Sequence, residues 1–73
     1  MKQNNLTNKN LLYYHMKEAG YTVDTLAKKV GMSRYSLMYK ASGKREFTST
    51  EIANLCKVLN ITDVVPVFLR DLG

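Results

Sequence analysis

The sequence has few of the residues from which catalytic and metal sites are built. Among its 73 residues there are one cysteine, one histidine and six acidic residues. Cys56 has no second cysteine with which to form a disulfide, which is typical of proteins from a reducing cytosol. His15 has no second histidine or cysteine at ligand spacing, so we expect no metal site. No carboxylate dyad, nucleophile–base pair or phosphate-binding glycine loop is present, so we predict neither enzymatic activity nor a cofactor.

Long apolar runs are also missing. No segment approaches the roughly 20 apolar residues that a membrane-spanning helix needs. The first ten residues, MKQNNLTNKN, are polar and lack the apolar segment of a signal peptide. We therefore expect a cytoplasmic protein with no membrane partner. Its apolar content of 45% still suffices for a packed core, although so short a chain gains much of its stability from any dimer or complex that it forms.

Acidic residues are scarce in one particular stretch. The chain carries 11 basic residues and a net charge of +5. Between Asp24 and Glu46 there is no acid, and a positive block of this kind suits a nucleic-acid backbone, although a solvated surface is the simpler alternative. The six basic residues of this stretch are Lys28, Lys29, Arg34, Lys40, Lys44 and Arg45.

Helical spacing and capping residues predict an all-α fold, a compact bundle of four to five helices. Residues 1–7 lack periodicity and are expected to form a flexible arm, and 8–73 a single domain. The expected helices cover about 8–19, 23–30, 34–41, 49–59 and 66–72, the last beginning at Pro66 because proline disfavours helical geometry in the residue before it. Ala19 should face the core with the first helix. The other predicted core residues are Leu12, Met16, Leu26, Ala27, Val30, Leu37, Ile52, Leu55, Cys56, Leu59 and Ile61.

Residues 22–47, TVDTLAKKVGMSRYSLMYKASGKREF, are the most informative segment. Two short helices, each preceded by a capping residue and separated by a turn at Gly31, are typical of a helix-turn-helix, here at about 22–41. If Leu37 and Ala41 point inward, the opposite face of the second helix carries Tyr35 and Tyr39. This face is available to a partner.

Three segments resemble the Cro/C1-type helix-turn-helix family of phage and bacterial repressors. They are TVDTLAKKVGMS, RYSLMYKASGKREF and TSTEIANLCKVLNIT, and the resemblance extends over about 12–61. The loop GKREFT followed by a glutamate–isoleucine pair looks like a phage-type branch. The resemblance implies a lambda-repressor-like DNA-binding domain from a small Cro-like regulator or modulator of a lysis–lysogeny switch.

The resemblance also implies residue roles. The start of the second helix of the motif would read bases, and Thr22 and the loop after that helix would contact phosphates. The residues predicted to bind DNA or a protein partner are Thr22, Ser33, Arg34, Tyr35, Ser36, Met38, Tyr39, Lys40, Ser42, Lys44 and Arg45. A homodimer on two half-sites is expected, and its predicted surface is the apolar tail with Val64, Val67, Phe68 and Leu69.

Two functions stay open at this point. Arg34 and Ser36 suit base reading, which favours a regulator that binds operator DNA. Tyr35 and Tyr39 are equally typical of protein interfaces, as is Met38. The alternative is therefore an antirepressor that binds the cognate phage repressor through the same face and alters its DNA binding. An RNA-binding function has little support, because no stacking-platform motif is present.

Overall fold

The computed structural model describes residues 7–69, whose regular structure is entirely helical. This confirms the predicted all-α fold, and four of the five predicted helices have nearly the predicted bounds. The predicted arm over 1–6 lies outside the described residues, while Thr7 is buried, so the arm prediction is wrong at that position. The helices are α1 (Lys9–Glu18), α2 (Val23–Val30), α3 (Arg34–Ala41), α4 (Ser49–Leu59) and α5 (Val64–Phe68).

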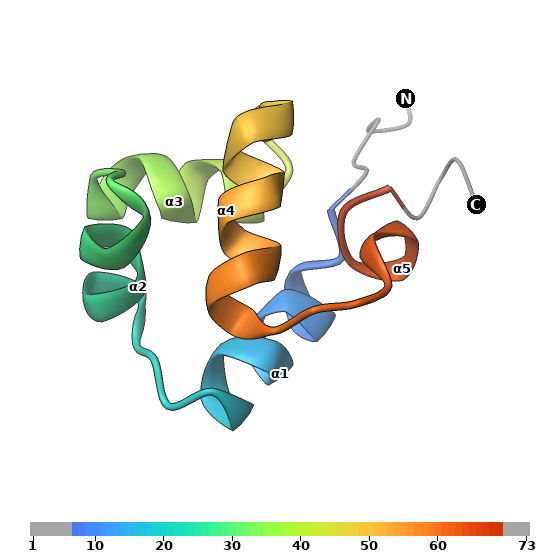
Figure 1. The fold of residues 1–73 in the computed structure, drawn as a ribbon. Helices are drawn as coiled ribbons and strands as arrows, with labels where there is room; N and C mark the ends of the chain where they lie inside the picture. The colour runs from blue at the N-terminus through green and yellow to red at the C-terminus, as the bar shows by residue number, and fades with distance from the viewer. Residues whose placement is uncertain (1–6, 70–73) are drawn as a thin grey trace.

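The longest helix, α4, stands in the middle of the domain (Figure 1). On one side of it lies the α2–α3 pair, and on the other lies α5, which packs against both α1 and α4. The start of α1 is tied to α5, because the Asn8 N–H donates to the Val67 carbonyl at 2.7 Å. This arrangement leaves α3 at the edge of the bundle, with α2 as its main neighbour.

Apolar side chains from all five helices meet in one core. The prediction is confirmed for most of its members, and Val30, Ile52 and Cys56 are half-buried against it. Burial raises the pKa of the Cys56 thiol, which therefore packs as a neutral group. The core consists of Leu12, Met16, Leu26, Ala27, Leu37, Ala41, Phe47, Leu55, Leu59, Ile61, Val67 and Phe68.

The prediction that Ala19 faces the core is wrong. The first helix ends at Glu18, and Ala19 is an exposed C-cap whose N–H donates to the His15 carbonyl at 3.0 Å. The chain then turns at Gly20, so helical spacing no longer applies to the residues that follow. The burial pattern of α1 rests on Leu12 and Met16 alone.

The fifth helix begins before its proline rather than at it. Helix α5 covers Val64–Phe68, so Pro66 is its third residue, and the predicted continuation over 70–72 lies outside the described residues. The first four N–H groups of a helix have no acceptor within it, so a proline in the first turn removes no hydrogen bond. The local preference of Val65 for extended backbone is overridden here by packing of the residues that follow.

Packing of α5 also corrects the predicted dimer surface. Val67 is 0% and Phe68 2% exposed. The ring of Phe68 meets that of Phe47 edge to face, with centroids 5.5 Å apart. The prediction is therefore wrong for these two residues, because they complete the core of a single chain. Val64 and Leu69 are half-buried against the same core.

Candidate nucleic-acid interface

Capping interactions fix both helices of the α2–α3 pair. The Thr22 hydroxyl accepts from the Thr25 N–H at 3.2 Å, and the Thr25 hydroxyl accepts from the Thr22 N–H at 2.8 Å. The Ser33 hydroxyl accepts from the Ser36 N–H at 3.0 Å and starts α3. Both predicted site residues, Thr22 and Ser33, thus have a structural role as N-caps.

Gly31 makes the turn between these helices. It ends α2 with φ of 75°, a left-handed conformation that residues with a Cβ rarely adopt. The Met32 N–H returns to the Ala27 carbonyl at 2.9 Å and closes the turn. A short turn then leads directly to Ser33 and the first residue of α3, Arg34.

The outward face of α3 is aromatic. Tyr35 is 73% exposed, Met38 40% and Tyr39 38%. The rings of Tyr35 and Tyr39 stack with centroids 5.6 Å apart and an interplanar angle of 22°. Leu37 and Ala41 are buried on the opposite side of the helix, as their spacing predicts. Because these buried residues fix the orientation of α3, the stacked tyrosine pair lies on its solvent-facing side.

A groove beside this face includes two residues of α1 that sequence reasoning missed. Lys9 and Tyr13, from the first two turns of α1, lie across from the aromatic face, and no acid lines the groove. No local pattern could identify them, because their position depends on how α1 packs against the rest of the bundle. From α3 and the loop that follows it, the groove is lined by Tyr35, Met38, Tyr39, Ser42 and Lys44.

Two of the six basic residues in the predicted positive block are paired with acids. Arg34 Nε lies 2.8 Å from Asp24 Oδ1, and both side chains are more than 60% exposed. Lys40 Nζ donates to both carboxylate oxygens of Glu51, at 2.8 and 2.9 Å. The sequence showed no acid within the block, but folding brings one from each neighbouring helix. The structure thus reduces the number of free cations around α3.

The Lys40–Glu51 pair is part of the scaffold. Its side chains are only 14% and 23% exposed. Glu51 Oε1 also accepts from the Thr48 N–H at 2.9 Å, while the Thr48 hydroxyl accepts from the Glu51 N–H, and the two bonds form a capping box at the start of α4. Burial by itself would raise the pKa of the Glu51 carboxyl, but these hydrogen bonds outweigh it and hold the pKa below its ordinary value. Lys40 thus has a structural role, and its predicted role in binding stays a prediction.

The other predicted residues keep their place at the surface. Lys44 and Arg45 are exposed, as are Lys28 and Lys29 at the end of α2. Within residues 7–69 none of these four takes part in an ion pair. Ser42 donates to the Tyr39 carbonyl at 2.9 Å, which leaves its oxygen as an acceptor.

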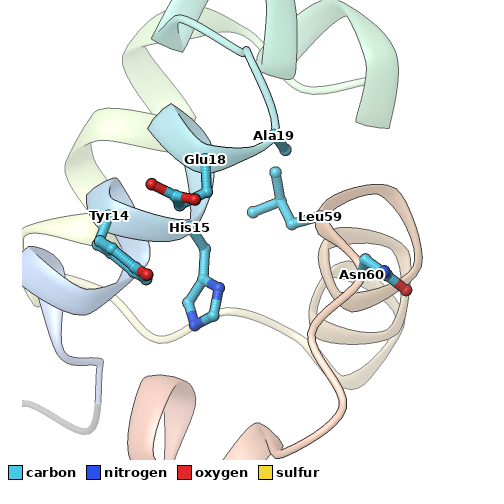
Figure 2. A pocket seen from close by; sticks show the side chains of 6 residues that line it. All are labelled: Tyr14, His15, Glu18, Ala19, Leu59 and Asn60. Atoms are coloured by element: carbon cyan, nitrogen blue, oxygen red, sulfur yellow. The ribbon is translucent and has the colours of Figure 1, made fainter.

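A second hollow lies at the other end of α1 (Figure 2). Tyr14, His15, Glu18 and Ala19 line it from the α1 side, and the end of α4 supplies Leu59 and Asn60. Across residues 7–69 no three histidine, cysteine, aspartate or glutamate side chains gather where they could hold a metal ion. Nor is any helix in that range long and apolar enough to cross a membrane.

Two capped helices joined at a left-handed glycine, with the second helix exposed along one face, define a helix-turn-helix domain. A family model described as the Cro/C1-type HTH DNA-binding domain matches residues 12–62, which is more than half of the chain. The protein belongs to this family, and the resemblance seen in the sequence is confirmed. This membership supports a DNA-binding transcription regulator. Neither the curated proteins nor the solved structures gave a significant match.

Proposed function

We propose that this protein is a phage-type transcription regulator that binds operator DNA and acts in the lytic–lysogenic decision, in the cytoplasm of a bacterial host. The observation that carries the proposal is the exposed face of α3, which is followed in the chain by Lys44 and Arg45, two cations without an ion pair among residues 7–69. A helix of eight residues with one bare face fits the major groove. Cations beside it gain binding free energy by releasing counterions from the phosphates.

In this proposal α3 enters the major groove of the DNA, with its first turn directed toward the base edges. Arg34 and Ser36 supply polar groups for base edges, while the phenols contact thymine methyl groups or phosphates. Lys44 and Arg45 anchor the backbone that borders the groove, with Ser42 between them and α3. Affinity should therefore fall steeply with salt concentration.

A single domain of this size reads only one short half-site. Two copies on half-sites about one helical turn apart would supply useful affinity. With Val67 and Phe68 inside the core, Val64 and Leu69 are the members of the predicted dimer surface that retain partial exposure. A homodimer formed on DNA is part of the proposal.

A second candidate function is favoured by the groove next to α3. Its lining of three tyrosines and a methionine has the composition of a protein-binding hot spot rather than of a base-reading surface. An antirepressor would place this face against the cognate repressor and block or alter its binding to DNA. In that case Tyr35→Ala or Tyr39→Ala should each cost roughly 2 kcal/mol of complex stability.

A gel-shift experiment separates the two candidates. The purified protein is added to the DNA that flanks its own gene at about 0.15 M salt, with and without the neighbouring repressor. A sequence-specific shift by this protein alone supports operator binding. No shift, together with loss of the repressor's shift, supports the antirepressor instead. No shift and no effect on the repressor would contradict both.

A further inference from the structure

The guanidinium of Arg34 approaches α2 through the nitrogen nearest its stem. Nε lies 2.8 Å from Asp24 Oδ1. Within residues 7–69 the two terminal Nη groups have no hydrogen-bond partner. Both side chains are well exposed, and exposed ion pairs contribute little to folding. The contact therefore matters more for where the guanidinium points than for stability.

Asp24 places a negative charge on this otherwise basic surface. It lies in the first turn of α2, two residues after Thr22, whose equivalent region the family resemblance assigns to phosphate contact. A free carboxylate there would repel phosphates. A favourable interaction with the helix dipole explains an acid in this turn, but it does not require contact with the first residue of α3. Pairing with Arg34 gives the carboxylate a second role besides its interaction with the helix dipole.

We propose that Asp24 is a positioning residue, which orients Arg34 so that its terminal edge reads a guanine in the operator. Guanine presents two acceptors, N7 and O6, in the major groove, and the two terminal nitrogens of an arginine donate to both at once. Adenine presents one acceptor and one donor there, so it cannot satisfy the same edge. The inference rests on the proposed operator binding and specifies what one residue recognises.

The carboxylate would also suppress non-specific binding. An arginine without a partner donates readily to any phosphate. With Nε held by Asp24, phosphate contact must compete with the carboxylate, whereas guanine contact uses nitrogens that Asp24 leaves free. Removing Asp24 should therefore weaken discrimination while strengthening binding to random duplex. These opposite changes distinguish orientation of Arg34 from a general effect on folding.

The test begins with selection of duplexes from a random library by the wild-type protein. Each guanine of the selected site is then replaced by 7-deazaguanine, which lacks the N7 acceptor. At one guanine the replacement should weaken wild-type binding about tenfold, the usual size of one base contact. Arg34→Ala should lose this sensitivity. Asp24→Ala should lose most of it and bind a random 30-base-pair duplex several-fold more tightly than the wild type does.

Two further variants serve as controls. Asp24→Asn keeps a side-chain oxygen next to Nε and should retain most of the guanine sensitivity. Asp63→Ala removes the same charge from an exposed residue that is far along the chain and forms no ion pair within 7–69. This variant should retain the full guanine sensitivity of the wild type. Circular dichroism establishes that each variant is folded.

Three results would overturn the inference. Asp24→Ala could show the wild-type sensitivity at the same guanine, which would leave Asp24 as a helix-dipole residue only. Asp24→Ala could weaken selected and random duplexes equally, as a purely structural residue would. The selected site could contain no guanine whose effect depends on Arg34. If the wild-type protein enriches no duplex at all, the proposed operator binding fails as well, which is a distinct outcome.

Discussion

The two ends of α3 carry the same kind of ion pair in different surroundings. At its start, Arg34 meets Asp24 of α2 with both side chains largely in solvent. Near its end, Lys40 meets Glu51 of α4 with both side chains mostly buried. Water screens the first pair and allows its partners to separate. The second pair is largely excluded from solvent and is strengthened by hydrogen bonds. Burial, rather than the charges themselves, decides which pair supports the fold and which stays available to a partner.

The largest expected effect comes from removing the acid of the buried pair. Glu51→Ala should lower the free energy of unfolding by about 2 kcal/mol, because it leaves the Lys40 ammonium without its partner and opens the capping box of α4. Urea denaturation followed by circular dichroism measures this. Glu18→Ala, at an exposed residue, is the matched control and should change it by less than about 0.5 kcal/mol. Equal effects of the two variants would mean that burial does not matter here.

Lys40 and Lys44 should contribute differently to DNA binding. Lys44→Ala should reduce the slope of log affinity against log salt by about one unit, as loss of a phosphate contact does. Lys40→Met keeps the apolar stem and should leave that slope unchanged, while it lowers stability by roughly 1 kcal/mol. Titration of both variants on the same duplex at several salt concentrations provides the comparison. A reduced slope for Lys40→Met would return Lys40 to the binding surface.

Acid should weaken the buried pair in a defined range. The pKa of Glu51 is lower in the folded state than in the unfolded state. Its contribution to stability is then fully present above the unfolded-state pKa of about 4.3, and it is lost as the pH falls through the lower folded-state pKa. Glu51→Gln should remove this component from a plot of stability against pH. Identical plots for the two proteins between pH 2 and 6, about the range in which carboxyls titrate, would contradict the assignment.

The smallest effect is expected at the exposed pair. Arg34→Ala should change the free energy of unfolding by no more than about 0.5 kcal/mol, because exposed ion pairs contribute little. Thermal denaturation should accordingly shift by no more than about 4 °C. A larger loss would show that the exposed pair also supports the fold.

Most of the fold follows from local patterns. The caps at Thr22 and Ser33 and the left-handed residue Gly31 lie where sequence patterns predict them, because capping involves only neighbours in the chain. The helical stripe around Leu37 is equally local. These signals set the helix-turn-helix before any tertiary contact is considered.

The errors concern contacts between distant residues. An apolar tail predicts burial but not the surface against which it packs, so the sequence places Phe68 at a dimer surface, whereas it fills the core beside Phe47. A cluster of basic residues predicts positive charge, but the acid that pairs with Lys40 comes from the next helix. Lys9 and Tyr13 reach the groove only through the packing of α1. No one-dimensional pattern contains this information.

The hydrogen bond between Asn8 and Val67 has a consequence for any attempt to transplant α3 into another protein. This hydrogen bond joins opposite ends of the described chain, and Phe68 beside it completes the core on which α4 rests. Helix α3 packs on that core directly through Leu37 and Ala41, and it also contacts α2 and pairs with α4 through Lys40 and Glu51. A graft of residues 22–47 into another scaffold would therefore retain most of the residues proposed to contact DNA, but it would lose Glu51 and the core of α1, α4 and α5 on which α2 and α3 pack. The whole domain is therefore the unit to transfer if the proposed specificity is to be kept.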